Sequence, residues 1–214
     1  MTTTATIPTS FDERLRTLGP GETLVPASFS DFIACLAECE YRIEYDRGNI
    51  VLMSIASDEH EQIVANLLYT LVSQLKENPE FKRYGSNRHV FIEALEKAYS
   101  PDAAVVKGQP VPFTYSAGKE AYTNPWLVAE VISPSSRNRD FGDKLLGYKA
   151  IPSLQYIVYL EQDRPFATLF ERLPGSERWR STDYDSLSQS LPVGGIALEM
   201  KDMYDNLNFE PKVG

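Results

Sequence analysis

The clearest amphipathic pattern in the chain covers residues 57–78. Apolar residues recur there every three or four positions and form one broad stripe, which predicts a helix. The stripe consists of Ile63, Val64, Leu67, Leu68, Leu71, Val72 and Leu75. His60 and Glu61 lie one turn before the stripe and on its side. A shorter helical pattern follows Ser28 or Ser30, either of which can act as its N-cap.

Two kinds of strand pattern follow. Alternating residues predict a hairpin over residues 41–54, with its turn at residues 46–49. Continuous apolar runs predict interior strands that are covered on both faces, and these runs are residues 102–108, 126–133 and 154–161. Weaker patterns predict a strand at 87–95, a helix at 139–151 that ends before Pro152, a hairpin at 165–182, and a strand with a helical turn at 194–207.

These elements predict an α/β (α+β) arrangement in which helices flank a mixed β-sheet. The Thr- and Pro-rich residues 1–24 are expected to form a flexible arm, and residues 25–214 a single domain. No Gly-rich phosphate loop follows any predicted strand, which argues against dinucleotide-binding and P-loop folds.

Charge and composition narrow the function. The chain has 43% apolar and 24% charged residues, as in ordinary globular proteins, and no apolar run long enough to span a bilayer. Its first residues do not form a secretory signal, so a cytoplasmic protein without membrane contact is expected. A net charge of −9 argues against nonspecific binding of nucleic acids. Locally, however, residues 137–149 carry four basic side chains against two acidic ones. Cys35 and Cys39 are predicted to be half-buried helix thiols.

Two of the interior strands contain a carboxylate, which is costly to bury without a partner. Asp102 shares a strand face with Ala104, and Glu130 shares one with Val128. If the strands are neighbours, two like charges about 4 Å apart would repel by about 4 kcal/mol. The pair therefore calls for a cation, and two carboxylates with a backbone carbonyl and waters are ligands that Mg²⁺ accepts.

The helix after the second interior strand provides a positive group. Lys144 lies four residues before Tyr148 on one helix face, near the end of the Glu130 strand, where its ammonium can balance the acids or a phosphate charge. The simpler interpretation is an ion pair with Asp140 on a solvated surface, and Asp140 is also expected to cap the helix. Tyr148 is more typical of a packing residue.

In their order and spacing these residues resemble the Uma-two family of restriction endonuclease-like proteins. The resemblance covers about residues 28–207 and rests on Pro101-Asp102, Glu130-Val131, Ser133, Asp140, Lys144, Tyr148, the preceding His60, and the ending "LPVGGIALEMKDMYDNL". It implies a PD-(D/E)xK nuclease fold over residues 25–214, with a central mixed sheet flanked by helices. By this resemblance, Asp102 and Glu130 are the metal-binding acids.

The sequence departs from the superfamily pattern at one position. A lysine is expected two residues after the second acid, where this chain has Ile132. The resemblance implies that Lys144 takes its place. The acid that many such nucleases carry on their first helix would correspond to Glu61, or be replaced by His60. Glu61 also has a structural explanation, as the N3 residue of a capping box begun by Asp58.

We therefore expect a Mg²⁺- or Mn²⁺-dependent endonuclease that hydrolyses DNA phosphodiesters. Asp102, Glu130 and the Val131 carbonyl would hold the metal, while Lys144, Glu61 and His60 would complete the catalytic set. Two alternatives stay open: an inert nuclease-like module with a binding or regulatory role, which the acidic composition favours, and a metal hydrolase of small phosphate esters. A homodimer or higher homo-oligomer is expected because symmetric assemblies are common.

Overall fold

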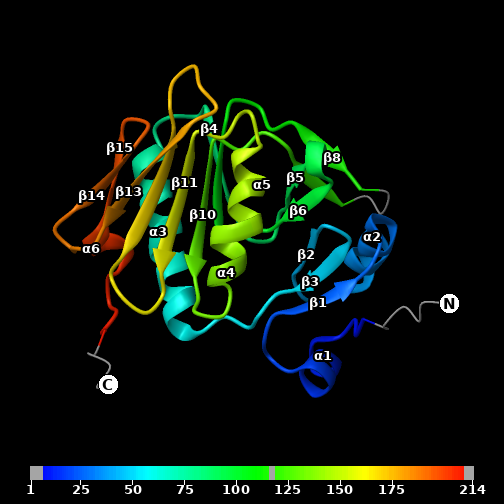
Figure 1. Cartoon of the computed structure of the whole chain (residues 1–214). Helices are drawn as coiled ribbons and strands as arrows, with labels where there is room; N and C mark the ends of the chain where they lie inside the picture. The colour runs from blue at the N-terminus through cyan, green and yellow to red at the C-terminus, as the bar shows by residue number, and fades with distance from the viewer. Residues whose placement is uncertain (1–6, 116–118, 210–214) are drawn as a thin grey trace.

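The computed structural model describes residues 7–115 and 119–209. Two large sheets lie side by side, and helices cover both faces of one of them (Figure 1). In the described ranges the helical elements are α1 (Phe11–Leu18), α2 (Phe29–Glu38), α3 (Asp58–Leu75), η1 (Glu93–Leu95), α4 (Arg137–Arg139), η2 (Asp140–Lys144), α5 (Leu145–Lys149) and α6 (Met200–Met203). No helix in these ranges has the length and apolar character needed to cross a membrane.

The sheet that carries the predicted acids has the strand order β13-β12-β11-β10-β7-β4. Only β10 and β11 run parallel to each other, and all other neighbours are antiparallel, so the sheet is mixed. Its strands are β4 (Phe81–Gly85), β7 (Ala103–Lys107), β10 (Leu127–Ile132), β11 (Tyr156–Glu161), β12 (Ala167–Arg172) and β13 (Trp179–Tyr184). The expected mixed sheet flanked by helices is confirmed.

Alternation along β7 and β10 explains why these strands are apolar throughout. Ala103, Val105 and Ala129 pack into the core beneath α3, whereas Ala104 and Val128, which pair with each other, pack into the core beneath α5. Each strand thus supplies two cores at once, as expected for a sheet covered on both sides. Glu130 continues the set of residues that faces α5, and Asp102 immediately precedes β7 on the same alternation.

The second sheet was not expected as a separate unit. Its strand order is β1-β3-β2-β6-β5-β9-β8, and the predicted hairpin of residues 41–54 forms its β2–β3 pair. The strands are β1 (Thr23–Pro26), β2 (Ile43–Asp46), β3 (Asn49–Leu52), β5 (Val90–Ile92), β6 (Lys97–Tyr99), β8 (Pro112–Thr114) and β9 (Glu120–Tyr122). A further pair, β14 (Ser190–Val193) and β15 (Ile196–Glu199), precedes the predicted C-terminal helical turn, α6.

The N-terminal segment differs from the predicted flexible arm over its described part. Residues 1–6 of that arm lie outside the described residues, but α1 and β1 are ordered elements. Ser10 caps α1 through the backbone N–H of Glu13, and Arg14 is buried, donating to the carbonyls of Gly21 and Met53. Within residues 11–24 the chain forms a helix and a strand, and Arg14 ties them to the rest of the fold because it satisfies the backbone carbonyls of Gly21 and Met53.

Other local predictions hold with adjustments. Ser28 caps α2 in a complete capping box with Asp31. Cys35 and Cys39 are partly buried thiols at the end of that helix. The helical stripe on α3 is narrower than expected, since Val72 is 44% exposed.

Candidate active site

Asp102 lies at the start of β7, where it meets the end of β10. Its Oδ2 accepts the backbone N–H of Val131 at 2.9 Å and lies 3.3 Å from Nε2 of His60, and its Oδ1 lies 3.5 Å from the Arg42 guanidinium. The residue is only 5% exposed. Burial alone would raise the pKa of Asp102, but His60, Arg42 and the Val131 N–H outweigh burial and lower it. Asp102 is therefore a fully ionised carboxylate near neutral pH.

Glu130 lies on β10 and faces α5. Its Oε1 is 2.7 Å from the ammonium of Lys144 and accepts a hydrogen bond from the Tyr148 hydroxyl. Burial raises the pKa of Glu130 to about 8, against the opposing effect of Lys144 and with the help of the negative charge of Asp102 and Asp140. The two acids thus affect each other electrostatically, which is the situation that a cation between them would relieve.

Lys144 is 1% exposed, so the interpretation as a surface ion pair does not apply. Its ammonium lies 2.7 Å from Glu130, 3.2 Å from Glu44 and 3.9 Å from Asp140. Burial alone would lower the pKa of Lys144, but these carboxylates raise it. The ammonium is consequently charged at neutral pH and held within an acidic surrounding.

The helix that carries Lys144 is not a regular α-helix. Between α4 and α5 a π-helical turn, η2, contains Gly142 with non-helical dihedral angles, and the N–H of Leu145 donates to the carbonyl of Asp140. Asp140 makes no side-chain capping bond, contrary to its expected role, because the helix already begins at Arg137. Instead, Asp140 is buried and faces the same cavity as Lys144.

His60 and Glu61 take different positions. The N-cap of α3 is Ser57, not Asp58, so His60 holds the N3 position and Glu61 lies outside the expected capping box. His60 is 8% exposed and points at Asp102, whereas the Glu61 side chain is 66% exposed. Burial alone would lower the pKa of His60, but the hydrogen bond and charge of Asp102 raise it. Nδ1 of His60 is buried without a hydrogen-bond partner among the described residues, 3.7 Å from Glu61.

These groups line one cavity of about 340 Å³, which we call the acidic cavity. Of the predicted residues, Asp102, Glu130, Val131, Lys144 and His60 line it, while Glu61 does not. The rest of its wall comes from residues 20–21, 42, 53–57, 133–136, 140 and 162. Asp102 and Glu130 therefore face a common space at the end of β10 and not opposite sides of the sheet.

The charge network contains three further residues, Glu44, Arg139 and Arg42, to which the sequence assigned no role in the site. Glu44 on β2 is fully buried, and it accepts the Ser100 N–H and pairs with both Lys144 and Arg139. Arg42 precedes β2 and contacts Asp102. The sequence offered one indication that Glu44 is special, since it is a charged residue within an alternating hairpin. Its partners could not be predicted, because they are far away in sequence.

The acidic cavity offers a divalent ion only a few protein ligands, and this number is enough for Mg²⁺. Across residues 7–115 and 119–209, no three His, Cys, Asp or Glu side chains are arranged to hold a metal. Mg²⁺, however, commonly uses one or two carboxylates and keeps several waters. Two carboxylates beside one cavity match this donor set, and Oε2 of Glu130 has no hydrogen bond from the described part of the chain. An ion there would take over the charge balance that Lys144 and His60 provide.

Other proteins resemble this chain in sequence and in fold. A protein of Synechocystis sp., described as uncharacterized, is 28% identical over 140 residues, which are 65% of this chain and 77% of that protein. The crystal structure of a protein from Anabaena variabilis, described as a "putative nuclease belonging to DUF820", superposes with a TM-score of 0.66 at 18% identity and covers 84% of this chain and 98% of its own. That likeness shows a common nuclease-like fold. Residues 29–201 match the Uma2 family, described as "Putative restriction endonuclease", and the chain belongs to that family.

Proposed function

We propose that this protein is a divalent-metal-dependent endonuclease that hydrolyses DNA phosphodiesters with Mg²⁺ or Mn²⁺. The observation that carries the proposal is the meeting of Asp102 and Glu130 at one cavity, with the buried ammonium of Lys144 2.7 Å from Glu130. The membership of the Uma2 family supports the same reaction. Enzymes lower reaction barriers by about 8–23 kcal/mol, and phosphodiester hydrolysis requires the upper part of that range.

The residues have separate roles in this proposal. Asp102, Glu130 and the carbonyl of Val131 would hold the ion. When bound, it would polarise the scissile phosphate and acidify a water molecule. Lys144, released from Glu130, places its ammonium against the charge that develops on the phosphate. His60 orients Asp102 through its Nε2 contact, and its unpartnered Nδ1 is directed towards Glu61, which lies at the edge of the site.

The proposal is tested with supercoiled plasmid incubated with Mg²⁺ or Mn²⁺. The wild-type protein should nick the plasmid, and Glu130→Gln should reduce the rate at least a hundredfold. The matched control is Glu161→Gln, which changes a buried acid at the end of the neighbouring strand β11 outside the acidic cavity. Thermal unfolding of each variant checks that it is folded. Equal nicking by wild type and Glu130→Gln would disprove the assignment.

One observation favours an inert binding or regulatory module instead. Both acids are already paired, Glu130 with Lys144 and Asp102 with His60 and Arg42, so the site is electrostatically complete without a metal. Calorimetric titration with Mn²⁺ separates the two functions. An endonuclease should bind Mn²⁺ with an affinity that Glu130→Gln abolishes, whereas an inert module should give no heat of binding.

The proposed substrate has consequences for location and assembly. A DNA endonuclease of this kind would act in the cytoplasm, and cutting both strands favours a two-fold homodimer or a higher homo-oligomer. Sedimentation equilibrium over a range of protein concentrations tests the assembly. A monomer at all concentrations would rule out the paired arrangement without affecting the nicking of one strand.

A further inference from the structure

Two further cavities share lining residues with the acidic cavity. Arg42 lines both the acidic cavity and a cavity of about 540 Å³, which we call the His89 cavity. Asp102 lines both the acidic cavity and a third one of about 520 Å³, the Tyr84 cavity. The His89 and Tyr84 cavities share residues 86–88. The three cavities are thus neighbours around Arg42, Asp102 and residues 86–88, and we call the set of three the strand groove.

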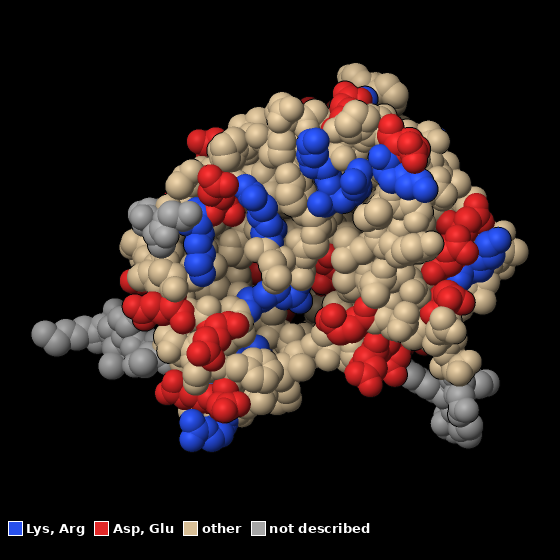
Figure 2. Space-filling view, turned by 180° about the vertical axis from the view of Figure 1, so that it is seen from behind, with Lys and Arg blue, Asp and Glu red and all other residues tan. Residues whose placement is uncertain are grey.

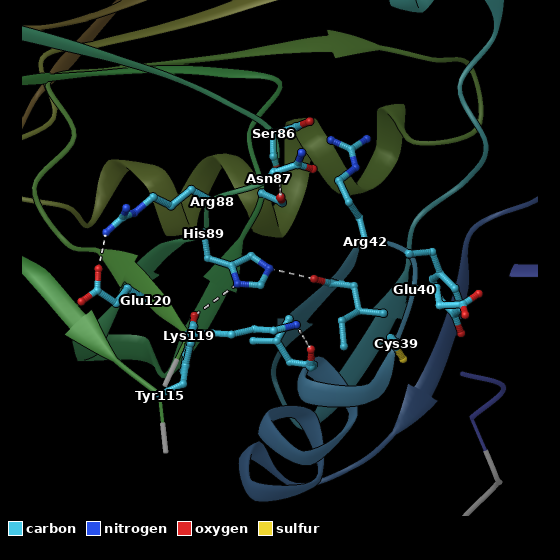
Figure 3. A pocket seen from close by; sticks show the side chains of 14 residues that line it. Cys39, Glu40, Arg42, Ser86, Asn87, Arg88, His89, Tyr115, Lys119 and Glu120 are labelled. Atoms are coloured by element: carbon cyan, nitrogen blue, oxygen red, sulfur yellow. Dashed lines mark hydrogen bonds and ion pairs between the residues drawn. The ribbon is translucent and has the colours of Figure 1, made fainter. Parts of the chain in front are cut away.

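The His89 cavity is polar, and the His89 side chain that lines it is held in place by two contacts (Figure 3). The His89 imidazole is held at both nitrogens, with the Ile43 carbonyl 2.9 Å from Nε2 and the Tyr115 hydroxyl 3.4 Å from Nδ1. Asn87 lies between Arg88 on one side of the opening and Arg42 on the other, and Arg42 also lines the acidic cavity. These groups can donate hydrogen bonds to phosphate oxygens and to base edges.

The Tyr84 cavity adds an aromatic plane. The ring of Tyr84 stacks on Tyr122 with 4.9 Å between the centroids, and the Arg88 guanidinium lies 5.7 Å from the centroid of Tyr84. Tyr84 is half-buried and lines the cavity. Rings and guanidinium planes of this kind stack with unpaired bases, and this interaction does not depend on the base sequence.

The positive charge of the groove is limited. Its Lys and Arg side chains are Arg42, Arg83, Arg88, Lys119 and Lys144, on a protein of net charge −9. Arg88 is paired with Glu120 at 2.8 Å and Arg42 with Asp102. Figure 2 shows basic side chains beside and above a hollow near the centre of one face, whereas acidic side chains dominate its lower edge. A duplex interface needs a broad positive surface, which this charge distribution does not provide.

We propose that the strand groove binds one unpaired DNA strand, with bases stacking at Tyr84 and nucleotides next to the scissile phosphate seated in the His89 cavity. This substrate class rests on the proposed function, because it places the backbone of that strand beside Asp102. Arg42, at the junction of two cavities, exchanges its contact with Asp102 for a phosphate of the strand. The Arg88–Glu120 pair weakens the binding of the strand, because Glu120 neutralises a guanidinium that would otherwise contact the DNA backbone.

The test measures binding by fluorescence anisotropy in EDTA, so that it does not depend on metal or on cleavage. The probes are a fluorescein-labelled oligo(dT) 12-mer and the same strand paired with its complement. Single-strand binding should be at least tenfold tighter. A plot of the logarithm of the association constant against the logarithm of the salt concentration should have a slope of about −2 to −3. This slope corresponds to three or four phosphate contacts at about −0.7 each.

Two substitutions in the Arg88–Glu120 pair should change the affinity for single-stranded DNA in opposite directions. Arg88→Ala should weaken single-strand binding about fivefold or more, and Glu120→Gln, which frees Arg88, should strengthen it. Tyr84→Leu should weaken it about tenfold through lost stacking. Lys76→Ala is the control, because Lys76 lines none of the three cavities and its side chain is 65% exposed.

Several outcomes would overturn the groove. They are tighter binding of the duplex, no binding of either DNA at low salt, or the same effect for Arg88→Ala and Glu120→Gln. These results are separate from the endonuclease proposal. If the variants change single-strand binding as expected but the protein does not nick DNA with Mg²⁺ or Mn²⁺, the groove proposal is supported and the endonuclease proposal is rejected. If the protein nicks DNA but the variants leave binding unchanged, the endonuclease proposal is supported and the groove proposal is rejected.

Discussion

Replacing Lys144 by Met tests whether its ammonium supports the acidic cavity. Methionine keeps the length of the side chain but removes the charge that lies 2.7 Å from Glu130 and 3.2 Å from Glu44. Removing one partner of a buried ion pair typically costs about 3–5 kcal/mol. Since the pKa of Glu130 is raised to about 8, this carboxyl can take up a proton near neutral pH. We therefore expect a loss of about 3 kcal/mol in the free energy of unfolding.

The assay is urea unfolding followed by circular dichroism at pH 7.5, with and without Mn²⁺. In parallel thermal unfolding, about 3 kcal/mol corresponds, for a chain of this size, to a fall of about 6–12 °C in Tm. In the variant, an ion bound at a hundred times its Kd should return about 2.7 kcal/mol, more than in the wild type, where it competes with the ammonium. The control, Lys76→Met, removes an exposed charge and should cost little. A loss below about 1 kcal/mol for Lys144→Met would show that the pair behaves as an exposed one and would refute the reasoning.

Three further changes probe other contacts. Tyr148→Phe removes the hydroxyl that donates to Glu130 and should lower the free energy of unfolding by about 1–2 kcal/mol in urea titrations, with no effect at all counting against that bond. Gly147→Ala would bring a methyl group 2.8 Å from the ring of Tyr99, so overpacking should cost about 1–3 kcal/mol in the same assay, and an unchanged midpoint would contradict the close packing. Burial lowers the pKa of His89 below its unfolded value of 6.5, so neutral His89 stabilises the fold above pH 6.5 and this contribution is lost as pH falls. The stability difference between wild type and His89→Gln should therefore shrink from pH 7.5 to pH 5.5, and a constant difference would contradict the assigned direction.

The sequence predicted the parts of the fold that periodicity determines. The helical stripe of α3, the interior strands β7, β10 and β11, and the paired strands β12 and β13 are all present where expected. Alternation predicted that Asp102 shares a strand face with Ala104 and Glu130 with Val128. The register that pairs Ala104 with Val128 then puts the two acids on the same face of the sheet. Both residues line one cavity in the structure.

What the sequence could not provide depends on contacts between distant segments. Nothing local indicates that the 41–54 hairpin starts a second sheet, because its strands find β6 and β1 only in the folded chain. Glu44 and Arg139 are ordinary charged residues in the sequence, yet they form a pair at 2.7 Å across 95 positions. The cap of α3 was misplaced by one residue, since Ser57 and Asp58 are both good N-caps and only the observed bond to His60 selects Ser57.

The bend at Gly142 constrains the length of this part of the chain. The helical dihedral angles are interrupted there, so the number of residues between the bend and Lys144 sets the direction in which the Lys144 side chain points. Removing one residue between them would turn Lys144 by about 100° around the axis of the helix that follows and move the ammonium away from its carboxylates. Point substitutions at exposed positions here leave that direction unchanged. Among relatives that keep the acidic cavity, the number of residues between the bend and Lys144 should therefore vary less than their identity.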